Sequence, residues 1–431
     1  MESTVSSANQ LSLIEAVRAI SSGRLTSEAL LASCLERIDE RETQVGAWRH
    51  LDRANAEASA RHPGAGPLCG IPVGIKDLID TVDMPTGYGS PIYSDHFPCR
   101  DAACVSELRN AGAILLGKTV STEFAYFQPG KTANPQDLKR TPGGSSSGSA
   151  AAVADFHVPA ALGTQTAGSI IRPASFCGVV GYKPSYGLLP LTGIRALAPS
   201  MDHLGTLTRT VEDAGFLAAI LGRRPELDIQ SEDDDWVPKI GFCETPQWQQ
   251  AEPSTQALLR DAAQSLRSAG AVVQEFNLPE EFSDLGEAHQ LAMDYEVSVT
   301  GLFEVTNHAD QVSARFRERF AAGQATATRD YDSALQKAQR ARAALTMAMD
   351  AASSGCDVLI CPSAPGEAPE GLDATGDPVF NRIWTFSGVP CINVPGLKGP
   401  NNLPVGLQVV GRFGDDTRLL KAARWIHNQL G

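Results

Sequence analysis

The residues from Gly143 to Arg172 constrain the fold more than any other stretch of the chain. Two turns of small residues, Gly143–Ser149 and Thr164–Ser169, flank a run of alanines and a short apolar strand at His157–Leu162. Each turn precedes a segment expected to be helical, so hydroxyl groups and free backbone N–H groups should gather at helix N-termini. Such ends stabilise an anion or a developing oxyanion. Because an alanine helix and an apolar strand adjoin the serines, a solvated linker is a poor interpretation.

Strands and helices alternate along the rest of the chain. Apolar strands are expected at 69–75, 113–117, 177–183, 239–243, 272–276, 357–362, 389–394 and 405–410, and helices at 102–111, 122–127, 211–221, 254–269 and 416–429. This alternation predicts an α/β fold, a single large domain spanning 1–431 with a mixed, mostly parallel central β-sheet and helices on both faces. Residues 7–61 should form an N-terminal helical segment, and residues 280–354 a helical insertion that walls the substrate pocket.

Composition excludes several classes of protein. The formal net charge of −14 disfavours nucleic-acid partners, which need clustered Lys and Arg. No apolar stretch approaches the roughly 20 residues of a membrane helix, and the N-terminus lacks a signal-peptide pattern. The nine cysteines include no Cys-x-x-Cys pair and the eight histidines are dispersed, so no disulfide framework or metal site is indicated. We therefore expect a cytoplasmic protein with no membrane partner, no metal and no cofactor.

Serine and lysine remain as candidates for chemistry, since the P-loop, dinucleotide-binding and nucleophile-elbow patterns are missing. Ser169 follows Thr166-Ala167-Gly168, whose N–H groups could form an oxyanion hole, and Ser145 or Ser146 could relay a proton. A Ser–His–Asp arrangement is disfavoured, although His157 and His203 lie near these segments.

Three lysines come at the ends of apolar strands: Lys76, Lys118 and Lys183. Burial lowers the pKa of a lysine and can turn it into a base near neutral pH. The same position also suits a lysine whose stem lies on apolar surface while its ammonium reaches water. The residues alone do not choose among the three.

Several motifs together resemble the amidase signature family of Ser–cis-Ser–Lys amide hydrolases. The family's glycine/serine motif is matched by Gly143-Gly-Ser-Ser-Ser-Gly-Ser-Ala-Ala-Ala, and its nucleophile motif by Gly163-Thr-Gln-Thr-Ala-Gly-Ser-Ile-Ile-Arg. The upstream Gly70-Ile-Pro-Val-Gly-Ile-Lys76-Asp, the later Cys177-Gly-Val-Val-Gly-Tyr-Lys-Pro-Ser and Ser200-Met-Asp-His-Leu-Gly match as well. The similarity runs from about residue 8 to the C-terminus. Among subgroups, the chain is most similar to the short bacterial malonamidase-like amidases.

The resemblance implies hydrolysis of a linear amide C–N bond through a seryl acyl-enzyme. It implies Ser169 as the nucleophile, Lys76 as the base and Ser145, entered through a cis peptide bond, as the bridging serine. The oxyanion hole would consist of the N–H groups of Thr166, Ala167, Gly168 and Ser169, and Ser146 and Thr164 would support Lys76 and Ser145. One departure is Ala167, where many members carry glycine.

The substrate is less constrained. Malonamidase-like members bind a substrate carboxylate with an arginine at the position of Arg172, which implies a small carboxylated amide such as a malonamate-like molecule. If Arg172 instead pairs with an internal carboxylate such as Asp202, a neutral aryl, alkyl or urea-like amide becomes the expected substrate. The role of a glutamyl-tRNA amidotransferase-type A subunit stays open too, whereas a non-catalytic scaffold is disfavoured because Ser169, Ser145 and Lys76 occur together. Relatives often dimerise through N-terminal helices, so a homodimer is expected.

Overall fold

The computed structural model describes residues 7–230, 236–351 and 355–430, in which eleven strands form one sheet. Their spatial order is β1-β3-β2-β4-β6-β5-β10-β11-β9-β7-β8. The strands are β1 (Trp48–Leu51), β2 (Pro72–Lys76), β3 (Ile114–Thr119), β4 (Ala160–Gln165), β5 (Val180–Lys183), β6 (His203–Thr208), β7 (Lys239–Phe242), β8 (Val272–Glu275), β9 (Val358–Pro362), β10 (Cys391–Lys398) and β11 (Pro404–Val410).

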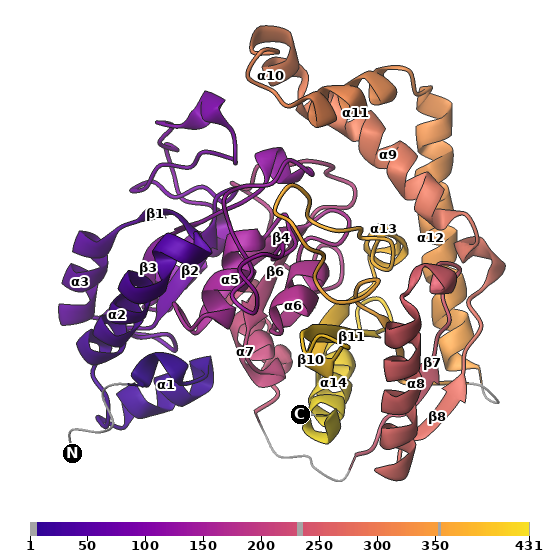
Figure 1. The fold of residues 1–431 in the computed structure, drawn as a ribbon, viewed down its shortest axis with the longest axis horizontal. Coiled ribbons are helices and arrows are strands. Elements are labelled where there is room, and N and C mark those ends of the chain that lie inside the picture. Colours follow the sequence, from indigo (N-terminus) through magenta and orange to yellow (C-terminus); the bar gives the residue numbers. More distant parts are fainter. Residues whose placement is uncertain (1–6, 231–235, 352–354, 431) are drawn as a thin grey trace.

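Helices surround this sheet, with the N-terminal helices at one side of the molecule and α9–α12 at the other (Figure 1). The helices are α1 (Leu13–Ser21), α2 (Ser27–Val45), α3 (Arg53–Arg61), α4 (Ala103–Asn110), α5 (Ser147–Ala154), α6 (Ile171–Cys177), α7 (Val211–Gly222), α8 (Pro253–Ser268), α9 (Leu285–Thr300), α10 (Leu302–Asn307), α11 (Ala314–Gln324), α12 (Thr328–Asp350), α13 (Arg382–Ser387) and α14 (Asp416–Leu430). Within the described residues, no helix is long and apolar enough to cross a membrane.

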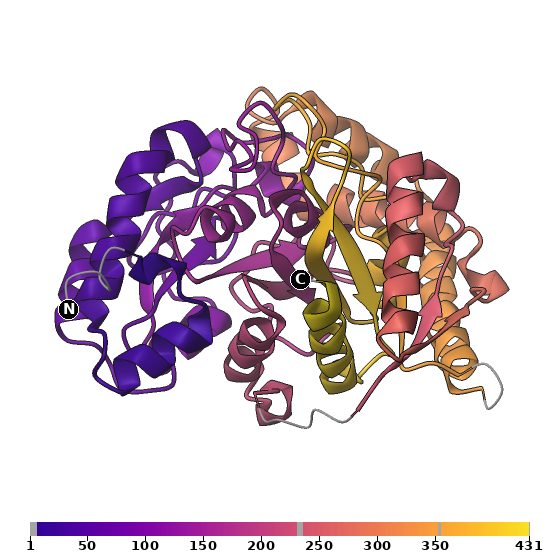
Figure 2. The same ribbon diagram turned by 60° about the horizontal axis from the view of Figure 1, so that its bottom comes forward.

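Successive residues of the central strands point to opposite faces, and both faces are covered. In β3, Leu115 packs in a cluster with α1, α4 and α7, whereas Ile114 and Leu116 pack with α2, α3, α5 and α6. In β9, Ile360 faces α7, α8 and α14, while Leu359 faces α9, α12 and α13. Helices α7 and α14 lie side by side on their face (Figure 2). This is the single-domain α/β fold with a mixed sheet that the sequence predicts.

The expectation of a mostly parallel sheet is wrong. Of the ten strand pairings among the described residues, six are antiparallel and four are parallel. The expectation rests on continuous apolar runs, which are typical of parallel strands because helices cover both faces. Here both faces are covered over the antiparallel strands as well, so the same apolar pattern results.

Some local expectations also differ from the structure. The segment 7–61 contains three helices together with β1, which pairs antiparallel with β3 at the sheet edge. The helix expected at 122–127 is only a 3₁₀ turn, Glu123–Ala125, in which Phe124 and Ala125 have positive φ angles of 47° and 65°. The expected strand at 157–162 starts later, at Ala160. Residues 280–351 are mostly helical, and the last three positions of the expected insertion, 352–354, lie outside the described residues.

Candidate active site

Parallel pairing brings the lysine and the second small-residue turn to the same edge of the sheet. Strands β2 and β4 run parallel, with Ile75 opposite Leu162, so Lys76 ends β2 beside Thr164 near the end of β4. The start of α5 approaches the same edge. A side chain at Gly148 would collide with the backbone of Ala47 and Val120. The first turn of α5 can therefore pack against these two residues only with glycine at position 148.

Lys76 is fully buried and surrounded by hydroxyl groups. Its Nζ lies 2.7 Å from Ser145 Oγ, 2.9 Å from Ser146 Oγ and 2.8 Å from Thr164 Oγ1. Burial holds the pKa of Lys76 well below its ordinary value, and the carboxylate of Asp202 opposes this shift only in part. The amine therefore favours its neutral form, in which the nitrogen lone pair can accept a proton.

Ser145 contacts Lys76 and also lines the pocket. The Gly144–Ser145 peptide bond is cis, as the resemblance implies for the entry to this serine. Ser146 Oγ also lies 3.2 Å from both the carbonyl oxygen and the amide nitrogen of Thr164. Ser146 and Thr164 thus bond both to each other and to Lys76, whose Nζ also contacts Ser145.

Ser169 follows the second turn and lines the same pocket as Ser145. Its backbone carbonyl accepts a hydrogen bond from Ser146 N at 3.3 Å. Within the described part of the chain, the backbone N–H groups of Thr166, Ala167, Gly168 and Ser169 have no acceptor. A Cβ at Gly168 would collide with the side chain of Asn381, so this turn requires glycine there.

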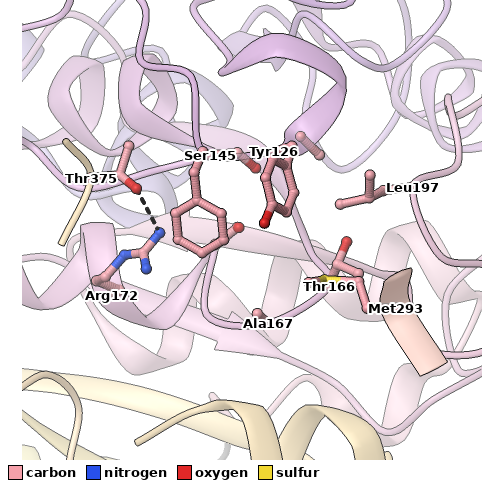
Figure 3. A pocket seen from close by; sticks show the side chains of 11 residues that line it. Tyr126, Ser145, Thr166, Ala167, Arg172, Leu197, Met293 and Thr375 are labelled. Carbon is pink, nitrogen blue, oxygen red and sulfur yellow. Dashed lines mark hydrogen bonds between the residues drawn. The ribbon is translucent and has the colours of Figure 1, made fainter. Parts of the chain in front are cut away.

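The pocket extends in both directions from Ser145 (Figure 3). Arg172 and Thr375 lie at one end, and Leu197 and Met293 at the other, with Tyr126 over the middle. The lining is Ala125, Tyr126, Phe127, Ser145, Thr166, Ala167, Ser169, Arg172, Leu197, Met293 and Thr375. Met293 belongs to α9, so the helical segment expected to wall the pocket contributes a side chain to it.

Arg172 lies at the pocket wall, where its hydrogen-bond partners are neutral. Its Nη1 donates to Gly376 O at 2.9 Å and its Nη2 to Gly144 O at 2.6 Å, while its buried Nε has no partner in the described structure. The guanidinium also stands 5.4 Å from the centre of the Phe127 ring. Burial lowers the pKa of Arg172 to about 9, against the nearby charge of Asp377.

Asp202, the internal partner considered for Arg172, makes other bonds. It accepts hydrogen bonds from Thr166 Oγ1 at 2.5 Å and from the N–H groups of Leu197 and Ala198. Burial raises the pKa of Asp202 to about 7. This carboxyl group thus anchors the hydroxyl of a turn residue.

The two histidines considered from the sequence lie elsewhere. His157 Nδ1 accepts from the indole N–H of Trp48 at 3.2 Å, and His203 Nδ1 contacts Met201 O at 2.7 Å. Neither bonds to Ser145 or Ser169 in the described structure, so the arrangement gives no Ser–His pair. Among the described residues, no three His, Cys, Asp or Glu side chains group as metal ligands.

Sequence reasoning missed several residues around this pocket. Tyr126 and Phe127 follow a turn with positive φ angles in place of the expected helix, and Thr375 comes from a loop more than 200 residues further along the chain. His289, on α9, donates to Thr166 O at 2.9 Å. No local pattern marks any of them. Only the packing of distant segments brings them to the turn.

Comparison with known proteins shows the family to which the chain belongs. The family model described as Amidase matches residues 29–420, and the chain belongs to this family, the amidase signature enzymes. It is 33% identical to the A subunit of the glutamyl-tRNA(Gln) amidotransferase of Anaeromyxobacter sp. (strain K), over 98% of this chain and 96% of that protein. The corresponding protein of Exiguobacterium sibiricum is 34% identical over 94% of both chains.

Solved structures give the same result. A crystal structure of an amidase superposes with a TM-score of 0.88 at 33% identity, covering 98% of this chain and 100% of that one. The peptide amidase of Stenotrophomonas maltophilia superposes with a TM-score of 0.82 at 27% identity, covering 98% and 97%. The chain is therefore an enzyme of the amidase family with the fold of these hydrolases.

Proposed function

We propose that this enzyme hydrolyses a small, carboxylate-bearing linear amide to a carboxylate and ammonia or an amine, through an acyl-enzyme on Ser169. The observation that carries the chemistry is the buried Lys76 Nζ, 2.7 Å from Ser145 Oγ at the pocket wall. A buried lysine with a lowered pKa can accept a proton, and a hydroxyl between lysine and nucleophile can pass that proton on.

The reaction follows from this order of groups. Neutral Lys76 accepts a proton from Ser145 while Ser145 accepts one from Ser169, whose Oγ forms a bond to the amide carbonyl carbon. The N–H groups of residues 166–169 stabilise the oxyanion. The same relay returns the proton to the amide nitrogen as the C–N bond breaks, and the amine leaves. Water, deprotonated through the same relay, then attacks the acyl carbon, and the relay returns that proton to Ser169 Oγ as the ester bond breaks and the carboxylic acid leaves.

Arg172 supports the choice of a carboxylated substrate. A buried guanidinium is costly unless an anion or good acceptors satisfy it, and here Arg172 donates to neutral acceptors. Because it lines the pocket that holds Ser169, a substrate carboxylate could pair with it while the amide carbonyl reaches Ser169. A short substrate with carboxylate and amide close together, such as malonamate, fits this requirement.

The test compares matched acidic and neutral amides. We expect wild-type enzyme to release ammonia from malonamate with a higher kcat/KM than from malonamide, and Ser169→Ala to release none. In Arg172→Ala, which also loses a bond to Gly144 O, the malonamate-to-malonamide ratio should fall by at least roughly thirtyfold. The ratio within each variant cancels general damage. An unchanged ratio, or a preference for neutral, aryl or urea-like amides, would show that the substrate does not need a carboxylate. Activity in Ser169→Ala removes the nucleophile assignment.

A second candidate is the A subunit of an amidotransferase, favoured by the similarity to such subunits over nearly the whole chain. That role predicts release of ammonia from glutamine and a stable partner protein. It would replace the first proposal if glutamine is the preferred amide and activity rises on adding the partner. Sedimentation of the purified chain tests the expected homodimer in the same preparation.

A further inference from the structure

Two side chains, from helices far along the chain, donate hydrogen bonds to the turn that precedes Ser169. Thr166 O accepts a hydrogen bond from His289 Nε2 at 2.9 Å, and Ala167 O accepts one from Thr385 Oγ1 at 2.6 Å. His289 belongs to α9 and Thr385 to α13, more than 100 and 200 residues beyond the turn. Both side chains are fully buried and neither lines the pocket.

His289 can serve Thr166 only as a donor. A carbonyl oxygen accepts but does not donate, so Nε2 must carry the proton and Nδ1 the lone pair. Burial lowers the pKa of His289 to about 4, so the ring is neutral at ordinary pH. Its edge-on contact with Phe386, with ring centres 5.8 Å apart, fixes the plane of the imidazole.

The direction of the Thr385 hydroxyl is fixed by Gln165. The Gln165 Oε1 accepts from the N–H groups of Ile170 and Ile171, so the other end of this amide must be its NH₂ group. That group donates to Thr385 Oγ1 at 2.9 Å. The Thr385 proton is therefore left for Ala167 O, and the turn is cross-linked at Ala167 and at the start of α6.

These two bonds determine where the N–H groups of the turn point. In a trans peptide the C=O and N–H of one group point in opposite directions, and the Gly144–Ser145 bond is the only cis bond among the described residues. The N–H of Ala167 therefore points away from His289, and the N–H of Gly168 away from Thr385. Neither N–H has an acceptor in the described structure, and Ala167 lines the pocket.

We propose that His289 and the Gln165–Thr385 pair are positioning residues that aim the Ala167 and Gly168 N–H groups at the oxyanion of the reaction. This inference rests on the function proposed above. The side chains of His289 and Thr385 do not touch substrate. They act by restraining two consecutive peptide groups, so that no reorganisation is needed when charge develops on the carbonyl oxygen.

The experiment uses pairs of variants that differ in one donor. Thr385→Val keeps the shape without the hydroxyl and Thr385→Ser restores it, while His289→Leu removes the donor and His289→Gln restores an N–H. Thr255→Val serves as the matched control, because Thr255 is buried on α8 and its hydroxyl has no partner in the described structure. Each variant is checked for folding by its melting curve and assayed on the best amide substrate.

We expect kcat to fall about ten- to a hundredfold in Thr385→Val and His289→Leu, with KM nearly unchanged, since oxyanion contacts strengthen in the transition state. Thr385→Ser and His289→Gln should recover most of kcat, and Thr255→Val should match wild type. Affinity for a trifluoromethyl ketone analogue, which forms a tetrahedral oxyanion on serine, should fall in parallel with kcat.

Two outcomes overturn the inference. In one, Thr385→Val and His289→Leu melt lower but keep wild-type kcat per folded enzyme. In the other, kcat falls without recovery in the donor-restoring variants or without loss of analogue affinity. Failure of the proposed function is distinct, because it appears as inactive wild type or active Ser169→Ala.

Discussion

Lys76 and Lys118 lie on neighbouring parallel strands, and both are fully buried, yet their surroundings differ in kind. Lys76 meets the hydroxyls of Ser145, Ser146 and Thr164 at the pocket. Lys118 donates to the carbonyl of Ile79 and to Thr86 Oγ1, close to the carboxyl groups of Asp77 and Asp80. Lys183 resembles Lys118, because it donates to the carbonyls of Val389 and Pro184.

All three lysines are buried, so burial alone does not make a lysine reactive. Burial lowers the pKa of all three lysines, to about 8 for Lys118 and Lys183. A carbonyl oxygen cannot give up a proton, so Lys183 has none to accept from its two partners, and the hydroxyls beside Lys118, those of Thr81 and Thr86, do not line the pocket. A hydroxyl can give up a proton, and of the three lysines only Lys76 contacts a hydroxyl that lines the pocket, that of Ser145. What distinguishes Lys76 is therefore a hydroxyl partner that lines the pocket, because burial alone is common to all three lysines.

The largest expected effect is on activity. Lys76→Met should lower kcat by roughly a thousandfold or more, because it removes the final proton acceptor. Lys118→Met should change kcat by less than about threefold, because its partners lie outside the pocket, although a lower melting temperature is expected. Steady-state ammonia release and thermal melts of both proteins check this. Equal losses in the two folded variants would show that contact with the pocket does not distinguish Lys76 from Lys118.

The pH dependence gives a second test of the same difference. The base must be neutral, so kcat/KM should rise with pH through the pKa of Lys76 and then level off. Because burial holds the pKa of Lys76 well below its ordinary value, the plateau should be reached at a lower pH than an ordinary lysine would give. A profile from about pH 5 to 10 measures it. The pH midpoint of this rise should be the same in Lys118→Met. A midpoint that moves in this variant would mean that Lys118 is the group whose titration causes the rise.

The smallest effect is on stability. The pKa of Lys118 is about 8 when folded and near 10.4 in an unfolded chain, so unfolding takes up a proton between these values. The free energy of unfolding should therefore rise with pH in this window, by at most about 1.4 kcal/mol per unit from this group. Lys118→Met should flatten the rise. Urea unfolding at about pH 8 and pH 10 measures it, and parallel changes in wild type and variant would contradict the lowered pKa.

Much of this architecture could be predicted from the sequence, because the elements concerned are long or strongly apolar. The expected strands at 239–243 and 405–410 and the helix at 211–221 lie within two residues of β7, β11 and α7. The motif around Ser169 led to the family, which the comparisons show. Strand β6 was missed, because His203-Leu-Gly-Thr-Leu-Thr alternates too weakly to stand out.

The surroundings of the site were beyond sequence reasoning for a different reason. His289 is one histidine on a helix, and Thr385 one threonine on a short helix, and neither has a pattern that links it to residues 166 and 167. The choice among three strand-end lysines likewise depended on resemblance, since hydroxyl and carbonyl partners differ only once distant segments pack.

The hairpin of β10 and β11 has a consequence for how the chain is made. It lies between β5 and β9 in the sheet, yet it is the last β-structure along the described chain. Before residue 391 leaves the ribosome, the strands carrying Lys76 and the turn before Ser169 share no sheet edge with β7, β8 and β9. A nascent chain can thus hold every proposed reactive group and still lack the continuous sheet that links β5 to β9. Synthesis of the hairpin joins the two halves.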